Sequence, residues 1–150
     1  MKCLTLFLTC LLLVSASITG NGQEAQRKAQ FNTSKAGLAI EGYDPVAYFT
    51  QHKAVEGRKE ITLTREGITY RFSTERNKQL FQSTPVAYEP QYGGWCAYAM
   101  GATGEKVEVD PETFKIIDGK LFLFYNSFFN NTLKTWNKNE AALHKQADLH

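Results

Sequence analysis

The strongest constraint on the fold of this chain is an Asp118-Gly119 pair that lies between two apolar runs. One run, residues 114–117, is rich in Phe and Ile, and the other, residues 121–125, consists of Leu, Phe and Tyr. Asp-Gly readily adopts the positive φ angles of a two-residue hairpin turn, and these apolar residue types favour strands. We therefore predict a β-hairpin over residues 114–125.

A second hairpin and a helix are predicted upstream. Residues 61–64 alternate apolar and hydroxyl side chains, Glu66-Gly67 supplies a turn, and apolar side chains alternate again in the residues that follow. Next comes Ser73 or Thr74, whose side chain is suited to cap a helix. That helix is expected to end before Pro85, because proline interrupts a helix.

Apolar residues recur at steps near 3.6 residues from about Ser127 to the C-terminus. The residues in this series are Phe129, Leu133, Trp136, Leu143 and Ala147. The period predicts one amphipathic helix that packs on the sheet. Together these patterns predict an α+β fold, with a small antiparallel sheet built from two hairpins and packed helices.

The first twenty residues have the pattern of a secretory signal peptide. Lys2 precedes an uncharged apolar run over residues 4–14, and small residues follow at positions 15–17. The run is too short for a transmembrane helix, and no second apolar run follows it. The pattern predicts a periplasmic or secreted protein with residues 1–20 removed. Lipoprotein cleavage before Cys10 fits less well, because Thr9 is large for the preceding position.

Removal of this leader leaves a polar segment and one domain. Residues 21–37 are rich in polar side chains and lack a consistent apolar period, so we predict a flexible N-terminal arm followed by a domain over residues 38–149. Because Lys2 is the only charged residue in the leader, 16 basic and 15 acidic side chains remain, a net charge of +1. These charges are interspersed along the chain, which disfavours nucleic acid as a partner.

Cys96 is the single cysteine that remains after the leader with Cys3 and Cys10 is removed. Exported domains often contain disulfides, but one thiol cannot form a disulfide within the chain. The two glycines at 93 and 94 permit close approach by a ligand or another segment. A buried free cysteine also behaves as a small apolar residue, so functional and packing roles both stay open.

Several motifs occur in an order that is typical of one family. They are GYDPVAYF at residues 42–49, ITYRFS at residues 68–73 with Asn77 and Phe81 after it, PQYGGWCA at residues 90–97, and Asp110-Pro111 before the hairpin of residues 114–125. Over residues 38–149 the chain resembles the exported, longer branch of the YHS domain family. Short YHS domains are treble-clef-related modules found in heavy-metal and copper transport proteins. The resemblance therefore implies a YHS/treble-clef-related fold and a role in metal binding.

The chain departs from the short YHS domains at their cysteine positions. Ala47 stands after the Asp-Pro-Val turn, and Ser73 and Arg76 stand where later thiols are expected. The metal site of the short domains is therefore not carried over to this chain. Cys96 is the cysteine that matches the longer branch.

The soft metal donors in the exported chain are Cys96, Met100, His52, His144 and His150. Structural zinc takes four Cys or His ligands, whereas copper(I) accepts fewer thiolate, thioether or imidazole ligands. Cys96 and Met100 share a face if their segment is helical, although a strand fits the pattern equally well. We predict a soft-metal site, copper(I) first, formed by Cys96, Met100 and His52. A metal-transfer partner protein would complete the coordination where needed.

Two other functions stay open. In the first, Cys96 is the nucleophile of a thiol-dependent enzyme or the sensor of a redox-responsive protein, with His52 as the candidate base. In the second, the chain is a metal-free interaction module and Cys96 belongs to the core. Asp44 and the tyrosines beside it are expected to serve the turn and the aromatic core. The sequence contains no phosphate-binding glycine loop, hydrolase elbow or dinucleotide fingerprint.

Overall fold

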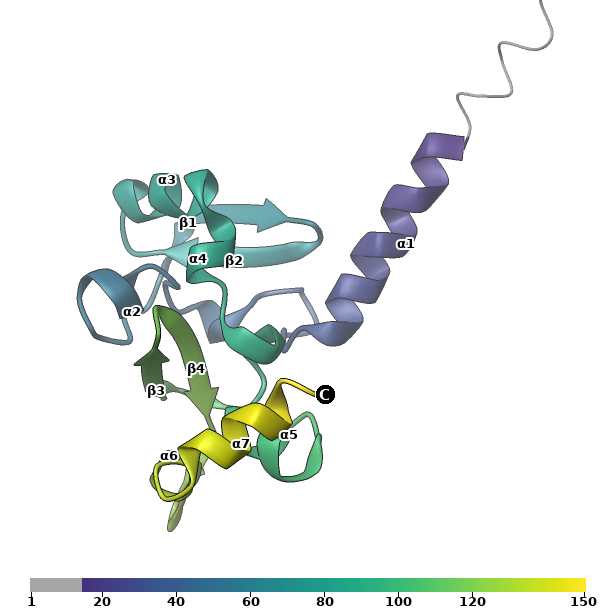
Figure 1. Cartoon of the computed structure of the whole chain (residues 1–150). Helices are drawn as coiled ribbons and strands as arrows, with labels where there is room; N and C mark the ends of the chain where they lie inside the picture. The colour runs from purple at the N-terminus through teal and green to yellow at the C-terminus, as the bar shows by residue number, and fades with distance from the viewer. Residues whose placement is uncertain (1–14) are drawn as a thin grey trace, which may run out of the picture.

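The computed structural model describes the backbone of residues 15–150, and side chains from residue 22 onward. The predicted signal peptide, residues 1–20, lies mostly outside the described residues, as do Cys3 and Cys10. Helices and small antiparallel hairpins make up the described part, which confirms the α+β prediction (Figure 1). None of the helices within residues 15–150 has both the length and the apolar character that crossing a membrane requires.

The elements follow one another along the chain with these bounds: α1 Ser15–Gln30, η1 Ile40–Gly42, α2 Ala47–Thr50, β1 Arg58–Arg65, β2 Ile68–Phe72, α3 Glu75–Ser83, α4 Pro85–Tyr88, η2 Gln91–Gly94, α5 Ala97–Thr103, β3 Asp110–Ile117, β4 Lys120–Phe124, β5 Asn126–Ser127, β6 Asn130–Asn131, α6 Thr132–Trp136 and α7 Glu140–Ala147.

The upstream hairpin, predicted around Glu66-Gly67, is present as β1 and β2, which pair antiparallel. Glu66 and Gly67 form its turn with φ angles of 49° and 81°. The predicted helix follows as α3, and the side chain of Thr74 caps it by accepting a hydrogen bond from the amide of Asn77 at 3.1 Å. This helix ends at Ser83, as the sequence predicts.

The hairpin predicted over residues 114–125 is present as β3 and β4, which also pair antiparallel. Asp118 and Gly119 form its turn, with φ angles of 49° and 72°. The two hairpins belong to separate two-stranded sheets, and not to the single small sheet predicted above. They meet through apolar side chains of a shared core instead of through a hydrogen-bonded ladder.

Strand β4 is buried on both faces and divides the core into two clusters. Leu121 and Leu123 lie in the first cluster, with side chains from α2, β1, β2 and α3. Phe122 and Phe124 lie in the second cluster, together with Trp136 of α6. Side chains alternate between the two faces of a strand, so a continuous apolar run places one set in each cluster. The strand thus holds the two halves of the molecule together.

The C-terminal region differs from the single helix predicted from the apolar period. Residues 126–131 form the β5–β6 hairpin, and two short helices, α6 and α7, follow. Asn131 accepts a hydrogen bond from the amide of Lys134 and so begins α6, while Asn139 precedes α7. Asparagine favours caps and turns over helix interiors, which explains both breaks. Trp136 is buried as predicted, whereas Phe129 is fully exposed.

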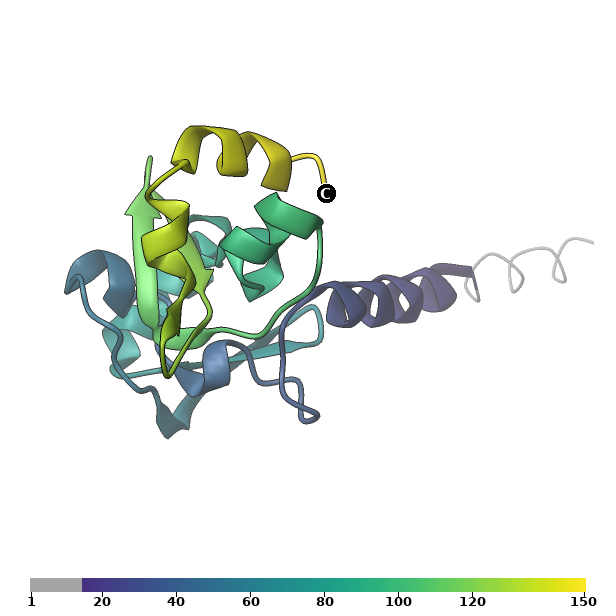
Figure 2. The ribbon, with the colours of Figure 1, turned by 90° about the horizontal axis from the view of Figure 1, so that it is seen from below.

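The polar segment predicted as a flexible arm, residues 21–37, is helical up to Gln30. Its residues include many good helix formers, such as Gln, Glu, Ala, Lys and Arg. Helix α1 projects away from the rest of the molecule (Figure 2), but its last turn is attached. The indole Nε1 of Trp95 donates to the carbonyl of Gln30 at 2.7 Å, and Nζ of Lys106 donates to that of Ala29 at 2.8 Å. These donors satisfy carbonyls that a helix end leaves unpaired.

Glu89, which follows α4, anchors the end of α1 to the first hairpin. Its Oε1 accepts hydrogen bonds from the hydroxyl of Tyr70 at 2.9 Å, from Nη1 of Arg65 at 3.2 Å and from Nη2 of Arg27. Burial and the adjacent Glu89 carboxylate raise the pKa of Tyr70 above its usual value. Tyr70 is therefore a neutral hydrogen-bond donor within this cluster.

Candidate functional site

Cys96 lies immediately before α5, and hydrogen bonds fix its backbone. Its amide donates to the carbonyl of Val107 at 2.9 Å, and its carbonyl accepts the amide of Met100 at 3.0 Å. Gly104 ends the helix in the left-handed conformation, with φ of 73°. Met100 thus lies in a helix and Cys96 is the residue that precedes its first turn, so the segment after Cys96 is helical and not a strand.

The thiol of Cys96 belongs to a ring of three hydrogen bonds. Its Sγ accepts the amide N–H of Tyr125 at 3.3 Å and lies 3.4 Å from Oγ1 of Thr132. That hydroxyl donates its own hydrogen to the carbonyl of Tyr125 at 2.8 Å. Because a hydroxyl has one hydrogen, the thiol must be the donor in its contact with Thr132. The ring connects the start of α5, the residue after β4 and the start of α6.

A pocket of about 340 Å³ lies against this ring. Besides Cys96, its wall contains the hydroxyl side chains of Thr103 and Thr132, the carboxylate of Glu105 and the rings of two tyrosines. The side chain of Cys96 is 0% exposed, so the sulfur lies behind the surface of the wall. A ligand in the pocket would contact the sulfur only if the side chains that cover it moved.

The structure places the other two predicted ligands away from this pocket. Met100 is 8% exposed on α5 and does not line the pocket. His52 is exposed in the turn after α2 with φ of 53°, and Figure 1 shows α2 far from α5. The predicted set of Cys96, Met100 and His52 is therefore not brought together. Residues 15–150 contain no group of three or more His, Cys, Asp or Glu side chains arranged to hold a metal ion.

The two remaining histidines are engaged in the C-terminal half. The ring of His144 packs edge-on against Phe122, with 5.0 Å between centroids, and its Nε2 lies 3.8 Å from Oδ2 of Asp148. The ring of His150 lies beside Gly104 at the end of α5. Neither histidine lines the Cys96 pocket. Cys96 is accordingly the one sulfur or imidazole donor among the described residues of that wall.

Asp44 forms a second cluster of polar groups, and it is completely buried. Its Oδ1 accepts the amides of Val46 at 2.9 Å and Ala47 at 3.3 Å, which confirms the predicted turn. Its Oδ2 accepts the amide of Ser73 at 2.8 Å, the hydroxyl of Ser73 at 2.6 Å and Nδ2 of Asn77 at 2.7 Å. Five donors thus occupy both oxygens, and the carboxylate joins the first turn to β2 and α3. We interpret Asp44 as a structural residue.

Sequence reasoning missed Tyr125 and Thr132 as partners of the cysteine. The three residues are distant in the sequence, and no local motif marks the ring that they form. Comparison of the chain with known protein families, with curated proteins and with solved structures finds no match in any of the three. The function is therefore inferred from the geometry of the Cys96 pocket.

Proposed function

We propose that the chain is a soft-metal binding protein of the YHS type, with copper(I) as its first candidate cargo and the Cys96 thiolate as its anchoring ligand. The observation that carries the proposal is a buried thiol bordering a pocket of about 340 Å³ whose wall also offers oxygen donors. Thiolate sulfur is a preferred ligand of copper(I). The carboxylate of Glu105, in the same wall, would offset part of the charge of an entering cation.

Metal binding would begin with loss of the thiol proton, because the thiolate is the ligand form of cysteine. The amide of Tyr125 already donates to the sulfur and would continue to do so. The hydroxyl of Thr132 would rotate its hydrogen from the carbonyl of Tyr125 toward the sulfur. Two donors would then face the buried negative charge and lower the cost of its desolvation.

The chain would provide one soft ligand, since Met100 and His52 do not line the pocket. Copper(I) needs at least one further ligand, which a partner protein or a small thiol would supply. Such an open coordination shell suits the transfer of an ion between carriers better than its storage. We therefore place the chain in metal transfer.

The closed ring around Cys96 favours a second candidate, a metal-free interaction module in which the thiol is structural. The sulfur is fully buried, and both of its hydrogen-bonding capacities are used within the protein. A thiol-dependent enzyme has no comparable support, because the described wall of the pocket contains no histidine to act as a base. The two supported candidates predict different behaviour for substitutions at Cys96.

The test is a copper(I) titration of the exported, processed chain under anaerobic, reducing conditions, in competition with a chromophoric chelator. We expect one equivalent to be drawn from the chelator, and we expect Cys96→Ser and Cys96→Ala to weaken binding at least about tenfold. Met100→Leu and His52→Gln serve as matched controls and should bind as the parent chain does. Equal binding by the parent and both Cys96 variants would refute the metal site.

Thermal unfolding of the same variants tests the structural candidate. Serine retains a donor and an acceptor for the ring, whereas alanine leaves the amide of Tyr125 without its partner. If Cys96 is only structural, Cys96→Ser should unfold at nearly the same temperature as the parent chain, and Cys96→Ala at a lower temperature. In that case neither the parent chain nor the variants should take copper(I) from the chelator.

A further inference from the structure

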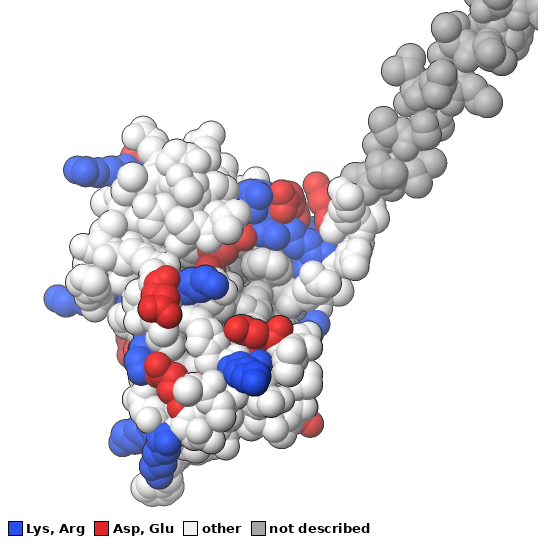
Figure 3. All heavy atoms as spheres, in the orientation of Figure 1, with Lys and Arg blue, Asp and Glu red and all other residues white. Residues whose placement is uncertain are grey.

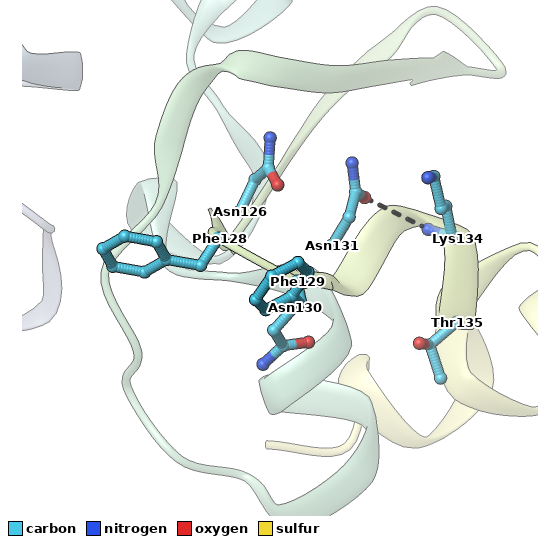
Figure 4. A pocket seen from close by; sticks show the side chains of 7 residues that line it. All are labelled: Asn126, Phe128, Phe129, Asn130, Asn131, Lys134 and Thr135. Carbon is cyan, nitrogen blue, oxygen red and sulfur yellow. Dashed lines mark hydrogen bonds between the residues drawn. The ribbon is translucent and has the colours of Figure 1, made fainter.

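The tip of the β5–β6 hairpin exposes two phenylalanines completely. Phe128 is 101% exposed and Phe129 is 106% exposed, and they form the two-residue connection between paired strands. The hairpin projects at the lower end of the molecule, below α6 in Figure 1. Figure 4 shows the ring of Phe128 directed outward, away from α6. Two adjacent aromatic rings in water are costly unless something covers them.

The backbone at the tip also departs from what its sequence favours. Phe128 has φ of 50°, a conformation that glycine and asparagine adopt readily and bulky residues rarely do. Hairpin turns of this length normally place Gly, Asn or Asp at such a position. Phenylalanine at position 128 is therefore unfavourable in two ways: its backbone conformation is strained, and its apolar ring is exposed to water. Residues that are strained in this way cluster at functional sites.

Two basic residues follow the tip in the sequence. Lys134 lines the hollow beside the tip, Lys138 comes just after α6, and residues 119–139 contain no acidic side chain. At the base of the hairpin, the carboxylate of Asp110 accepts a hydrogen bond from Nδ2 of Asn126 at 3.2 Å. Neither Lys134 nor Lys138 has an ion-pair partner among the described residues, whereas the nearby Glu140 is paired with Lys115. Figure 3 shows basic side chains beside the uncharged lower end of the molecule. Glu105 lines the Cys96 pocket together with Asn130 of β6.

A hollow of about 570 Å³ lies between the tip and α6. Its lining includes both phenylalanines, Asn131 and Lys134. The side-chain oxygen of Asn131 caps α6 (the dashed line in Figure 4), which leaves its amide nitrogen and the ammonium group of Lys134 as donors on the same side of the hollow. Such donors suit the oxygens of a phosphate group.

We propose that the β5–β6 tip docks on an anionic lipid bilayer. The two phenylalanine rings would enter the boundary between head groups and acyl chains, and Lys134 and Lys138 would lie at the phosphates. A protein partner would need a pocket shaped for a convex aromatic point, whereas a bilayer accepts such a point without one. The unpaired lysines favour a negatively charged surface. This inference rests on the tip alone and is independent of metal binding at Cys96.

Vesicle co-sedimentation of the processed chain tests the proposal. We expect binding to vesicles of phosphatidylcholine with about 30% phosphatidylglycerol, and weaker binding to pure phosphatidylcholine or at high salt. Phe128→Gly combined with Phe129→Ser should reduce binding about tenfold or more. Lys134→Gln combined with Lys138→Gln should also reduce it and should lessen its salt dependence. Val86→Ser with Leu149→Ser, at positions 74% and 72% exposed, should bind as the parent chain does.

The glycine variant separates loss of binding from loss of folding. Glycine adopts the φ angle at position 128 without strain, so the double tip variant should unfold at the same temperature as the parent chain or above it. Absence of vesicle binding by the parent chain would overturn the proposal, as would equal binding by the tip variant or equal binding to neutral vesicles. A dimer of the parent chain that the tip variant abolishes would instead show a second copy as the occupant.

Discussion

Replacing Asp44 by alanine is expected to lower the free energy of unfolding by about 3–5 kcal/mol, because five donors would lose their shared acceptor inside the protein. The change would disconnect the first turn from the start of α3. Urea denaturation, followed by far-UV circular dichroism, measures the effect.

Asp44→Asn tests whether both carboxylate oxygens are needed as acceptors. Whichever way the amide is turned, its NH₂ group would face N–H or O–H donors at one of the two oxygen positions. Asparagine should therefore be nearly as destabilising as alanine despite its similar shape. Asp118→Asn is the matched control, since this residue is exposed at a turn where asparagine is well tolerated. A loss below about 1 kcal/mol for Asp44→Asn would contradict the structural role of the carboxylate.

Trp136→Ala should destabilise the chain to a similar extent, by about 3–5 kcal/mol, since large core residues leave a cavity when truncated. The Trp136 ring is completely buried at the centre of the second cluster. It contacts Phe124 with 5.5 Å between ring centroids and Phe122 with 6.1 Å, and its Nε1 donates to Glu140 at 3.1 Å. Removal would loosen β4, α6 and α7 at once.

Comparison with an exposed aromatic residue isolates the effect of burial at Trp136. Phe129→Ala removes a ring that is fully solvated, so its effect on urea denaturation should stay within about 0.5 kcal/mol. Trp136→Phe should lie between the two, because it retains part of the packing and loses the hydrogen bond to Glu140. Equal stability of Trp136→Ala and Phe129→Ala would show that the second cluster contributes little to the fold.

Local signals in the sequence were enough to predict the two main hairpins and α3. The Asp118-Gly119 turn, the Glu66-Gly67 turn and the Thr74 cap each depend on a few adjacent residues whose conformational preferences agree with the fold. The prediction of a single C-terminal helix was wrong. It rested on an apolar period near 3.6 residues, which does not show where a helix is interrupted. Asn131, which caps α6, and Asn139, which precedes α7, divide that segment. The period continues across the break because both helices pack on the same cluster.

The site was harder to predict because it depends on contacts between distant segments. Cys96 was recognised as the single thiol, and its helical context was one of two alternatives. Its ring with Tyr125 and Thr132 joins residues 29 and 36 positions away, which no local pattern signals. Met100 was selected for its donor chemistry and for its spacing of four residues from Cys96, and His52 for its donor chemistry. Neither residue lines the Cys96 pocket. Donor chemistry and sequence spacing, without tertiary contacts, do not determine which side chains line a pocket.

The amide of Tyr125 offers the most direct test of metal binding at Cys96, because it donates to the sulfur that would hold the ion. An anaerobic copper(I) titration of the ¹⁵N-labelled chain should change this amide resonance progressively until one equivalent of metal has been added. The amide of Ser73, bonded to Asp44 at 2.8 Å, should remain unchanged as an internal control. A Tyr125 resonance that stays fixed, while copper(I) is bound elsewhere or not at all, would contradict the proposed site.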